Sequence, residues 1–400
     1  MNAIGGSGRA ETGAFDADVA IVGGGPAGAT AARALAARGI DTLVLERARL
    51  PRYKCCAGGI PARTVRLLDF PIEDAVEDTI TGIHLTHLGR HGFTRWSDRP
   101  LAYMVMRDRF DALLLDRARA AGARVRDGVT VRGVARDATG VRLDLGGASL
   151  TARYVLGADG ANSVVARALG LGQGLSACVA LEAEVEGNFL ARARWRGVMN
   201  LDLGYTPWGY AWLFPKRDLL SIGVVLDRTA AGDLRGELDR YLDRLGLRDA
   251  RVPRLSGHKI LFRRAHTPIA GEGAALLGDA AGLADEFSAE GIYYAIRSGQ
   301  LAAAEVARAL AGGRRRLGGY ERAVDRLLMP ELRAARIIAR LFYTSVRRAP
   351  RATFLLSRRL RANWQALFRV LRGESGYDTE LWRWPVLPAI AATVLRRAPP

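Results

Sequence analysis

The chain has 400 residues, 49% of them hydrophobic, and a formal net charge of +18 at pH 7. This length exceeds what one hydrophobic core usually supports, so we expect two interleaved domains with room for a buried cofactor. The positive charge is almost all arginine, and it admits an anionic partner, although an Ala- and Arg-rich genome explains it equally well. Without zinc-finger spacing, an RNA-binding sheet signature or a basic zipper, we expect no nucleic acid partner.

Three features bear on the compartment. Cys55, Cys56 and Cys178 are the only cysteines and form no disulfide framework, which suits a reducing environment. Residues 1–16 lack the apolar core of a signal peptide, and we expect a flexible tail there. No apolar run reaches the roughly 18 residues of a membrane span. We therefore expect a cytoplasmic protein, with any membrane contact peripheral and on the inner face.

A glycine-rich turn lies between two predicted strands near the N-terminus. Residues 18–46 run from an apolar strand through the turn and an alanine-rich helix to a second apolar strand, which is a parallel β-α-β unit. Gly23, Gly25 and Gly28 form G-x-G-x-x-G where the helix begins and the backbone must approach a pyrophosphate. Glu46 ends the second strand and can accept the ribose hydroxyls of an adenosine. This unit predicts a dinucleotide cofactor.

A downstream stretch, residues 275–295, bears on which dinucleotide is bound. An apolar strand leads into Gly278 and Asp279, and Glu290 and Gly291 open a helix. An aspartate there can hold ribityl or ribose hydroxyls, and the amides of a helix N-terminus can stabilise negative charge on a reduced isoalloxazine. Together with "GADGANSVVARAL" from residue 157 and "RDRFDALL" from residue 107, this stretch resembles the FAD-dependent oxidoreductases with the fold of the aromatic hydroxylases.

The resemblance implies an α/β fold: a Rossmann-like FAD-binding domain with aromatic-hydroxylase topology, an interleaved antiparallel-sheet substrate domain and C-terminal helices. It also implies that Arg107 contacts the cofactor and that Asp159 and Asp279 lie beside its linker. No metal site is expected. The residues expected to bind FAD are Gly23, Gly25, Pro26, Ala27, Gly28, Glu46, Arg47, Gly58, Gly59, Arg107, Asp159, Gly278, Asp279, Glu290, Gly291 and Ile292.

Two shorter motifs narrow the family. "YAWLFP", from Tyr210 to Pro215, matches the Y-x-W-x-F-P signature of geranylgeranyl reductases. "YKCCAGG", residues 53–59, is similar to their K-x-C-G-G-G loop, with Cys56 at the cysteine position. We call this segment the cysteine loop. The chain thus resembles a geranylgeranyl reductase family flavoprotein over about residues 18–310. The family resemblance implies hydride transfer to carbon-carbon double bonds of a polyprenyl chain.

The chain departs from these patterns at several positions. Ala57 stands where the loop usually has glycine, and "DEFSAEGI" replaces "DPFTGEGI", which puts Glu286 and Ala289 at unusual places near the flavin-facing backbone. Ala166 stands where the superfamily usually has an arginine, with Arg167 beside it. The missing arginine bears on whether this edge of the site can bind a pyridine nucleotide. The sequence has no second G-x-G-x-x-G that would offer a separate NAD(P)H site.

Tyr210, Trp212 and Phe214 share one face of a strand and would form one wall of a slot for a prenyl chain. The same stripe is typical of an ordinary sheet core, and only the accompanying motifs favour the slot. Reducing a trisubstituted alkene requires a hydride and a proton and builds positive charge on the tertiary carbon, which aromatic faces stabilise. Reduced flavin would supply the hydride, and an acid near the alkene would supply the proton.

Cys56 lies in the loop expected to reach the reactive edge of the flavin, as proton donor or as shaper of the alkene pocket, with Cys55 as a bystander. The other interpretation makes both thiols packing residues beside a glycine turn. Arg52 and Lys54 are expected to lower the pKa of a nearby thiol, which argues against a simple acid role. Neighbouring cysteines form a strained disulfide, and no histidine lies near them in the sequence to complete a metal site.

The order of these motifs predicts the domain organisation. In the last 70 residues, 14 arginines stand against four acids, and the apolar residues fall at helical spacing. Their apolar faces either close the second domain, which we favour, or dock on a membrane. Residues 216–218 separate two strand-like runs as a polar hairpin turn. The predicted parts are an FAD-binding domain (17–75, 101–174 and 263–325), a substrate-binding sheet domain (76–100 and 175–262) and a C-terminal helical region (326–400).

Two other functions share some of these motifs. A flavin-dependent monooxygenase or halogenase shares the FAD motifs, but the W-x-W-x-I-P strand of halogenases differs from this chain at Tyr210 and Phe214. Halogenases also carry a catalytic lysine soon after the glycine motif, and the only lysine in that region here, Lys54, already belongs to the cysteine loop. An electron relay similar to the quinone oxidoreductases would normally add an iron-sulfur domain, which Cys178 alone cannot ligate. The substrate head group (chlorin, glycerophospholipid, quinone or pyrophosphate) and the external reductant (NADPH or ferredoxin) stay open. The expected partners are a prenylated lipid-like substrate, a membrane surface and an electron-donor protein.

Overall fold

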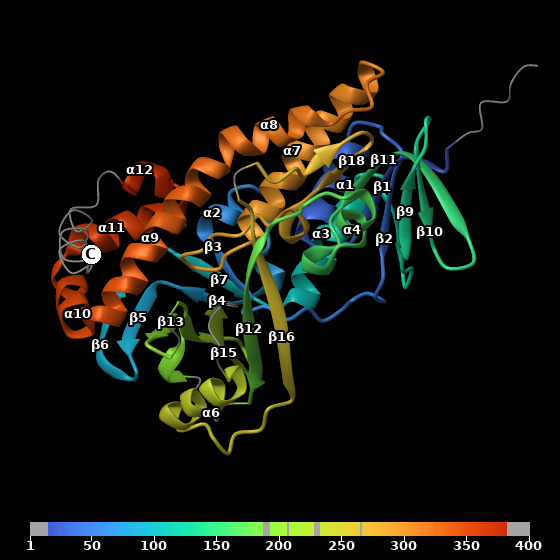
Figure 1. The fold of residues 1–400 in the computed structure, drawn as a ribbon. Helices are drawn as coiled ribbons and strands as arrows, with labels where there is room; N and C mark the ends of the chain where they lie inside the picture. Colours follow the sequence, from blue (N-terminus) through green and yellow to red (C-terminus); the bar gives the residue numbers. More distant parts are fainter. Residues whose placement is uncertain (1–14, 187–192, 206–207, 228–232, 265, 382–400) are drawn as a thin grey trace, which may run out of the picture.

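The computed structural model describes residues 15–186, 193–205, 208–227, 233–264 and 266–381. Most of the predicted N-terminal tail and the last part of the C-terminal helical region, residues 382–400, lie outside the described residues. Figure 1 shows two sheets side by side, with long helices along one side of the molecule. The fold class predicted from the sequence is confirmed, since parallel and antiparallel sheets combine with C-terminal helices.

An eight-stranded sheet contains the N-terminal β-α-β unit. Strand β1 (Ala17–Val22) pairs in parallel with β2 (Thr42–Glu46) and with β11 (Ser149–Gly157), and α1 (Pro26–Ala36) follows β1 through the glycine turn. Every residue of β2 is buried, as expected for a parallel strand covered on both faces. The remaining elements of this part are α3 (Arg107–Ala120), β8 (Arg124–Asp127), β9 (Gly133–Arg136), β10 (Val141–Asp144), α4 (Val164–Leu169), β17 (Ala270–Gly271), β18 (Ala274–Leu276), α7 (Ile292–Ala311) and α8 (Gly318–Leu327).

A seven-stranded sheet forms the second layer, in the order β16-β12-β15-β14-β13-β5-β6, antiparallel except where β13 and β5 pair in parallel. The predicted hairpin is present, because β14 and β15 pair antiparallel around residues 216–219. The strands of the seven-stranded sheet are β5 (Gly82–His87), β6 (Arg90–Trp96), β12 (Ser176–Val185), β13 (Val198–Leu203), β14 (Tyr210–Pro215), β15 (Leu220–Asp227) and β16 (Arg254–Phe262). Helix α6 (Leu234–Leu245) packs beside them.

A three-stranded sheet joins the two layers. Strand β7 (Ala102–Val105) pairs on one side with β3 (Gly59–Pro61) and on the other with β4 (Val76–Ile80). This pairing crosses the domain boundary predicted at residue 76, because β4 was assigned to the sheet domain and its partners to the FAD-binding domain. The short α2 (Ala62–Val65) and the 3₁₀ turn Glu73–Ala75 follow β3. The cysteine loop therefore leads directly into a sheet shared by both layers.

Up to residue 381, the C-terminal part consists of four helices: α9 (Met329–Arg348), α10 (Pro350–Arg359), α11 (Arg361–Arg372) and α12 (Tyr377–Leu381). Their apolar faces pack on the seven-stranded sheet, where Tyr343, Phe354 and Trp364 share one buried cluster with Ile83 and Phe93. These faces are therefore part of the core, as the favoured interpretation expects. Among the described residues, no helix is both long and apolar enough to cross a membrane.

Candidate active site

A cavity of about 710 Å³ joins the glycine turn, the cysteine loop and the aromatic strand. It extends from the carboxyl ends of β1 and β2 to the C-terminal helices, where Leu356, Trp364 and Leu367 line it. This volume falls in the range of roughly 300–1,000 Å³ that is typical of small-molecule and cofactor sites. All residues predicted to bind cofactor or substrate line the cavity, with the single exception of Gly28.

The glycine turn fits a pyrophosphate. Gly25 is the N-cap of α1, where no side chain caps the helix and no acidic residue lies in the first turn, so the first amides of the helix can bind an anion. A Cβ at Gly25 would meet only Arg52, at 3.7 Å, whereas one at Gly23 would lie 2.3 Å from the Ala158 carbonyl oxygen. Gly23 therefore makes the turn and Gly25 leaves its backbone open to the cavity.

Gly28 differs from the prediction because it does not line the cavity. A Cβ there would lie 2.0 Å from the carbonyl oxygen of Gly23. Its role is close packing of the helix on the turn, so the third glycine of the motif shapes the cofactor site without lining it.

Glu46 lies buried at the edge of the cavity. Its carboxylate accepts hydrogen bonds from the amides of Gly24 (2.8 Å) and Ala48 (3.1 Å), and Arg52 Nε lies 3.3 Å away. Arg52 also forms an ion pair with the fully buried Asp111 of α3, at 2.9 Å. Because the glycine turn and Arg52 hold the carboxylate in place, Glu46 is oriented for the ribose hydroxyls that the sequence assigns to it.

Arg107, at the start of α3, is buried and donates two hydrogen bonds to Asp111, at 2.8 and 2.9 Å. Burial by itself disfavours the charge, but the carboxylate of Asp111 more than offsets it and raises the pKa of Arg107 above its ordinary value. A charged guanidinium is thus fixed in the cavity wall, close to the cysteine loop.

Asp159 and Asp279 differ in how their oxygens are used. Oδ2 of Asp159 accepts the amide of Val164 (2.6 Å), while its Oδ1 is buried and has no hydrogen-bond partner in the described part of the chain. Burial raises the pKa of Asp159. An unsatisfied buried oxygen in the cavity wall fits a hydroxyl of a bound cofactor, since buried polar atoms are otherwise almost always paired.

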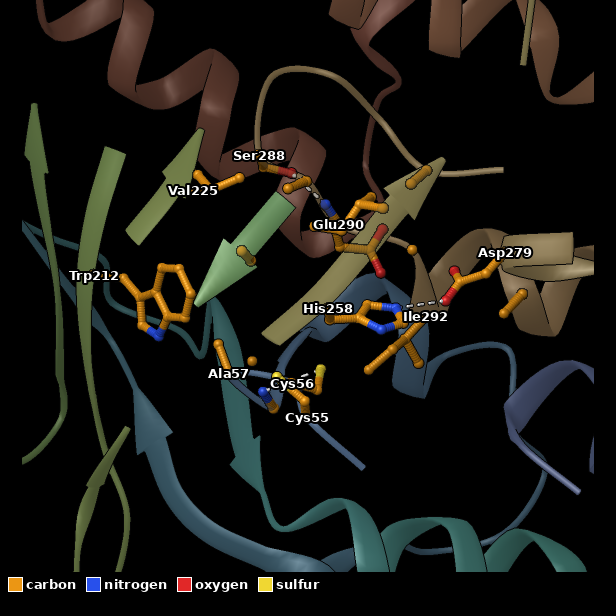
Figure 2. Close-up of a pocket in the computed structure, with 18 of the residues that line it drawn as sticks. Cys55, Cys56, Ala57, Trp212, Val225, His258, Asp279, Ser288, Glu290 and Ile292 are labelled. Carbon is orange, nitrogen blue, oxygen red and sulfur yellow. Dashed lines mark hydrogen bonds and ion pairs between the residues drawn. The ribbon is translucent and has the colours of Figure 1, made fainter. Parts of the chain in front are cut away.

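Asp279 is already engaged by two basic side chains. Its Oδ2 lies 3.2 Å from Nε2 of His258 (Figure 2). Nζ of Lys54 lies 3.8 Å from the same oxygen. Although burial opposes ionisation, the hydrogen bond from His258 and the charge of Lys54 hold the pKa of Asp279 below its ordinary value. Sequence reasoning missed His258, because a histidine on an edge strand more than 20 residues from its partner carries no local signal.

The cysteine loop contacts segments of both layers. Lys54 contacts Asp279, Cys55 Sγ donates to the carbonyl oxygen of Ser256 (3.3 Å), and the amide of Cys56 donates to Glu182 Oε2 (2.8 Å). Both cysteines line the cavity, and Figure 2 shows them in the space between Trp212 on one side and Asp279 on the other. Cys56 Sγ accepts the amide of Gly58 at 3.4 Å, interacts with the Arg107 side chain and lines the cavity.

Lys54 lowers the pKa of Cys55, as expected, but burial and the nearby Glu182 raise it by more, so the net shift is upward. Arg52 is instead paired with Glu46 and Asp111. The two cations hold the loop in place, and they leave Cys55 protonated.

The three aromatic side chains of β14 all face the cavity. Tyr210 and Trp212 meet edge to face with ring centroids 6.3 Å apart, and Tyr210 donates its hydroxyl to the Ser288 carbonyl. Phe214 packs on Gly59, where a Cβ would lie 3.0 Å from the ring. The three aromatic side chains therefore form a wall of the cavity, where the cysteine loop contacts the seven-stranded sheet.

The loop before α7 carries the departures noted in the sequence. Ala289 has φ of +57°, a left-handed conformation in which glycine costs least, and Glu286 pairs with Arg264 and Arg336. Glu290 Oε1 accepts the amide of Tyr293 (2.6 Å), and burial raises the pKa of Glu290 to about 7.

Lys216 was expected in a polar turn, but its side chain is buried. Its ammonium donates to the carbonyl oxygens of Ala57 (2.6 Å) and Val105 (2.9 Å).

Within the described ranges, no group of three or more His, Cys, Asp or Glu side chains could hold a metal ion.

Comparison with known proteins agrees with this geometry. A model of the FAD binding domain matches residues 16–189. The chloroplastic geranylgeranyl diphosphate reductase of Oryza sativa subsp. japonica is 30% identical over 416 residues, covering 95% of this chain and 87% of the relative.

Solved structures show the same fold. A geranylgeranyl bacteriochlorophyll reductase-like protein from Thermoplasma acidophilum has a TM-score of 0.77 at 22% identity, covering 95% and 98% of the two chains. The flavin-dependent brominase Bmp2 has a TM-score of 0.74 at 20% identity, covering 95% and 99%, which is a likeness of fold alone. The family and enzyme class predicted from the motifs are confirmed. This chain belongs to the geranylgeranyl reductase family of FAD-dependent oxidoreductases.

Proposed function

We propose that this enzyme reduces carbon-carbon double bonds in the geranylgeranyl or polyprenyl chain of a lipid-like substrate. The observation that carries the proposal is the continuity of the cavity. It leads from Cys56 and Gly291, past the aromatic side chains of β14, to Leu356 and Leu367 in the C-terminal helices. An elongated, mostly apolar space of this kind fits a flexible hydrocarbon chain better than a compact aromatic substrate.

The cofactor end of the cavity supports the assignment of FAD-binding residues. The amides at Gly25, the carboxylate of Glu46 and the oxygens of Asp159 and Asp279 offer groups for a pyrophosphate and for sugar hydroxyls. When bound and reduced, FAD supplies a hydride. The external reductant in our proposal is NADPH or ferredoxin.

The residues around the alkene would control water and charge. Tyr210, Trp212 and Phe214 present aromatic faces that can stabilise positive charge at a tertiary carbon while excluding water. Cys55 donates its S–H to the Ser256 carbonyl, whereas no such bond is present for Cys56 within the described residues. We therefore assign Cys56 the role of proton donor or of shaper of the alkene pocket.

The far end of the cavity supports an anionic head group or an anionic membrane surface as partner. Residues 341–373 contain eight arginines and no aspartate or glutamate. Arg348, at the end of α9, lines the cavity, and positive charge at a helix C-terminus is favourable. A cytoplasmic enzyme that contacts the inner membrane face peripherally is consistent with this distribution of charge.

The test begins with the absorption spectrum of the purified protein, followed by anaerobic reduction and mixing with geranylgeranyl diphosphate or a geranylgeranyl-bearing phospholipid. We expect bound FAD whose reoxidation accompanies a mass gain of two hydrogens per reduced bond. Cys56→Ser should bind FAD and lose turnover, while Cys55→Ser serves as the matched control. FAD that reoxidises only with oxygen, leaving the prenyl chain unchanged, would overturn the proposal in favour of a monooxygenase or halogenase.

A further inference from the structure

A buried chain of hydrogen bonds connects the aromatic wall to the cysteine loop. Trp212 Nε1–H donates to Ser221 Oγ at 3.2 Å, and the Ser221 hydroxyl donates to Glu182 Oε1 at 2.6 Å. The other oxygen of Glu182 accepts the backbone amide of Cys56 at 2.8 Å. Glu182 is 3% exposed and Ser221 1% exposed. One carboxylate thus receives a hydrogen bond from each side of the cavity.

Lys216 makes a second connection one residue further along the loop. It follows β14 directly, and its ammonium donates to the carbonyl oxygen of Ala57 and to that of Val105 in β7. Gly58 explains why the approach is so close: a Cβ there would lie 2.1 Å from the Val105 carbonyl oxygen and 2.7 Å from Nζ of Lys216. The strand that carries the substrate wall therefore also carries a cation that holds the loop.

Burying these charges is expensive, so the arrangement requires a reason. Burial lowers the pKa of Lys216 to about 8, and the charge of Glu182 partly opposes that shift. A buried charged side chain destabilises the fold unless it is hydrogen-bonded, and both groups form hydrogen bonds with the loop backbone, at Cys56 and at Ala57. The loop from residue 52 to residue 58 has no regular secondary structure. A backbone hydrogen bond from the Val105 amide to the Gly58 carbonyl holds its end, and side-chain contacts from Glu182 and Lys216 hold Cys56 and Ala57.

We infer that Glu182 and Lys216 are positioning residues that hold the Cys56 loop in register with Trp212 across the cavity. A displacement of about 1 Å at a reacting group can reduce a rate by roughly 100-fold, so such a device matters for a thiol that must meet an alkene. The inference deepens the proposed function, because it assigns residues to the same site. Its test uses the reactivity of the thiol, which requires no prenyl substrate.

The experiment measures the alkylation rate of Cys56 by iodoacetamide at pH 8 in the FAD-bound protein, read by mass spectrometry in a Cys55→Ser background. Trp212→Phe keeps an aromatic ring but removes the Nε1 donor. We expect this variant and Ser221→Ala each to change the alkylation rate at least threefold in the same direction, and Glu182→Gln at least tenfold. Because Trp212 and Ser221 act in series, the double variant should match Ser221→Ala alone rather than multiply the two effects.

The matched control is Glu186→Gln, at the residue that follows β12. Its exposed carboxylate pairs with the exposed Arg251 at 2.8 Å, away from the cysteine loop. We expect its alkylation rate to stay within twofold of the parent. If Glu182→Gln does not fold, the milder Trp212→Phe and Ser221→Ala variants decide the question.

Two outcomes separate this inference from the proposed function. Alkylation rates within twofold of the parent in Trp212→Phe, Ser221→Ala and Glu182→Gln would overturn the positioning role, even if prenyl reduction were observed. Altered thiol reactivity in a protein that never reduces a prenyl chain would leave the positioning role intact and remove the proposed substrate.

Discussion

Nε2 of His258 lies 3.2 Å from Oδ2 of Asp279, so an edge strand of the second sheet contacts the turn that the sequence assigns to the FAD linker (Figure 2). Lys54 approaches the same oxygen from the cysteine loop. The carboxylate is therefore charged and oriented before any cofactor hydroxyl reaches it. Three segments far apart in the chain cooperate to prepare one acceptor.

His258→Ala should weaken FAD binding about tenfold. A hydrogen bond to a charged group is worth about 1.5 kcal/mol, and without it Asp279 is less well oriented. Titration of the apoprotein with FAD, followed by flavin fluorescence, measures the dissociation constant. His84→Ala is the control, since His84 bonds to Thr94 in the sheet and does not line the cavity. Equal affinities for the His258→Ala and parent proteins would contradict this role.

Asp111→Asn should destabilise the protein by about 3–5 kcal/mol, because it leaves the buried Arg107 without its carboxylate and leaves Arg52 paired with Glu46 alone. Urea denaturation followed by circular dichroism measures the change. The control on the same helix is Asp116→Asn, whose exposed pair with Arg119 should contribute less than about 1 kcal/mol. A similar decrease in the free energy of unfolding in both variants would show that the ion pairs of Asp111 contribute no more to stability than an exposed pair.

Glu290→Gln should change how stability depends on pH. The pKa of Glu290 is raised to about 7 in the folded protein, so its contribution is complete below the ordinary value near 4.5 and is lost as the pH rises through 7. A glutamine stays neutral and avoids that loss. Between pH 5 and pH 8 the free energy of unfolding should shift in favour of the variant by at most about 3 kcal/mol. Urea denaturation at the two pH values measures the free energy of unfolding of both proteins. The same difference between variant and parent at pH 5 and at pH 8 would contradict the assignment.

Ala289→Gly should stabilise the protein by about 1 kcal/mol, because a left-handed conformation costs an L-residue about that much and glycine almost nothing. The control is Ala284→Gly in the same loop, where φ is not positive and the added backbone freedom should destabilise. Chemical denaturation compares the three proteins. A loss of stability in Ala289→Gly would mean that the methyl group contributes more than the strain.

Leu356→Trp should slow the reduction of a 20-carbon prenyl chain more than that of a 10-carbon chain. Leu356 lines the far end of the cavity, so an indole there shortens the slot without touching the cofactor end. Its neighbour Leu355 is 52% exposed on the same helix, which makes Leu355→Trp the matched control. Mass spectrometry of both substrates under single turnover measures the effect. Equal slowing of both chain lengths would place the substrate elsewhere.

The sequence by itself determined the local parts of the site. The strand, glycine turn and helix of residues 17–36 depend on neighbours a few positions apart, and the alternation of Tyr210, Trp212 and Phe214 follows from the period of a strand. The glycine turn indicated a dinucleotide, because a turn that admits a pyrophosphate tolerates few other residues, and the "YAWLFP" and "YKCCAGG" motifs narrowed the family.

Only the tertiary structure decided which side chains complete the site. Cys56 and Glu182 are 126 positions apart, and Lys54 and His258 are 204 apart, so no periodicity links them. Lys216 has the sequence context of a solvated turn and is buried because the carbonyl oxygens of another segment surround its ammonium. Partners for buried charges are found across sheets and loops, and such pairings exist only once the chain has folded.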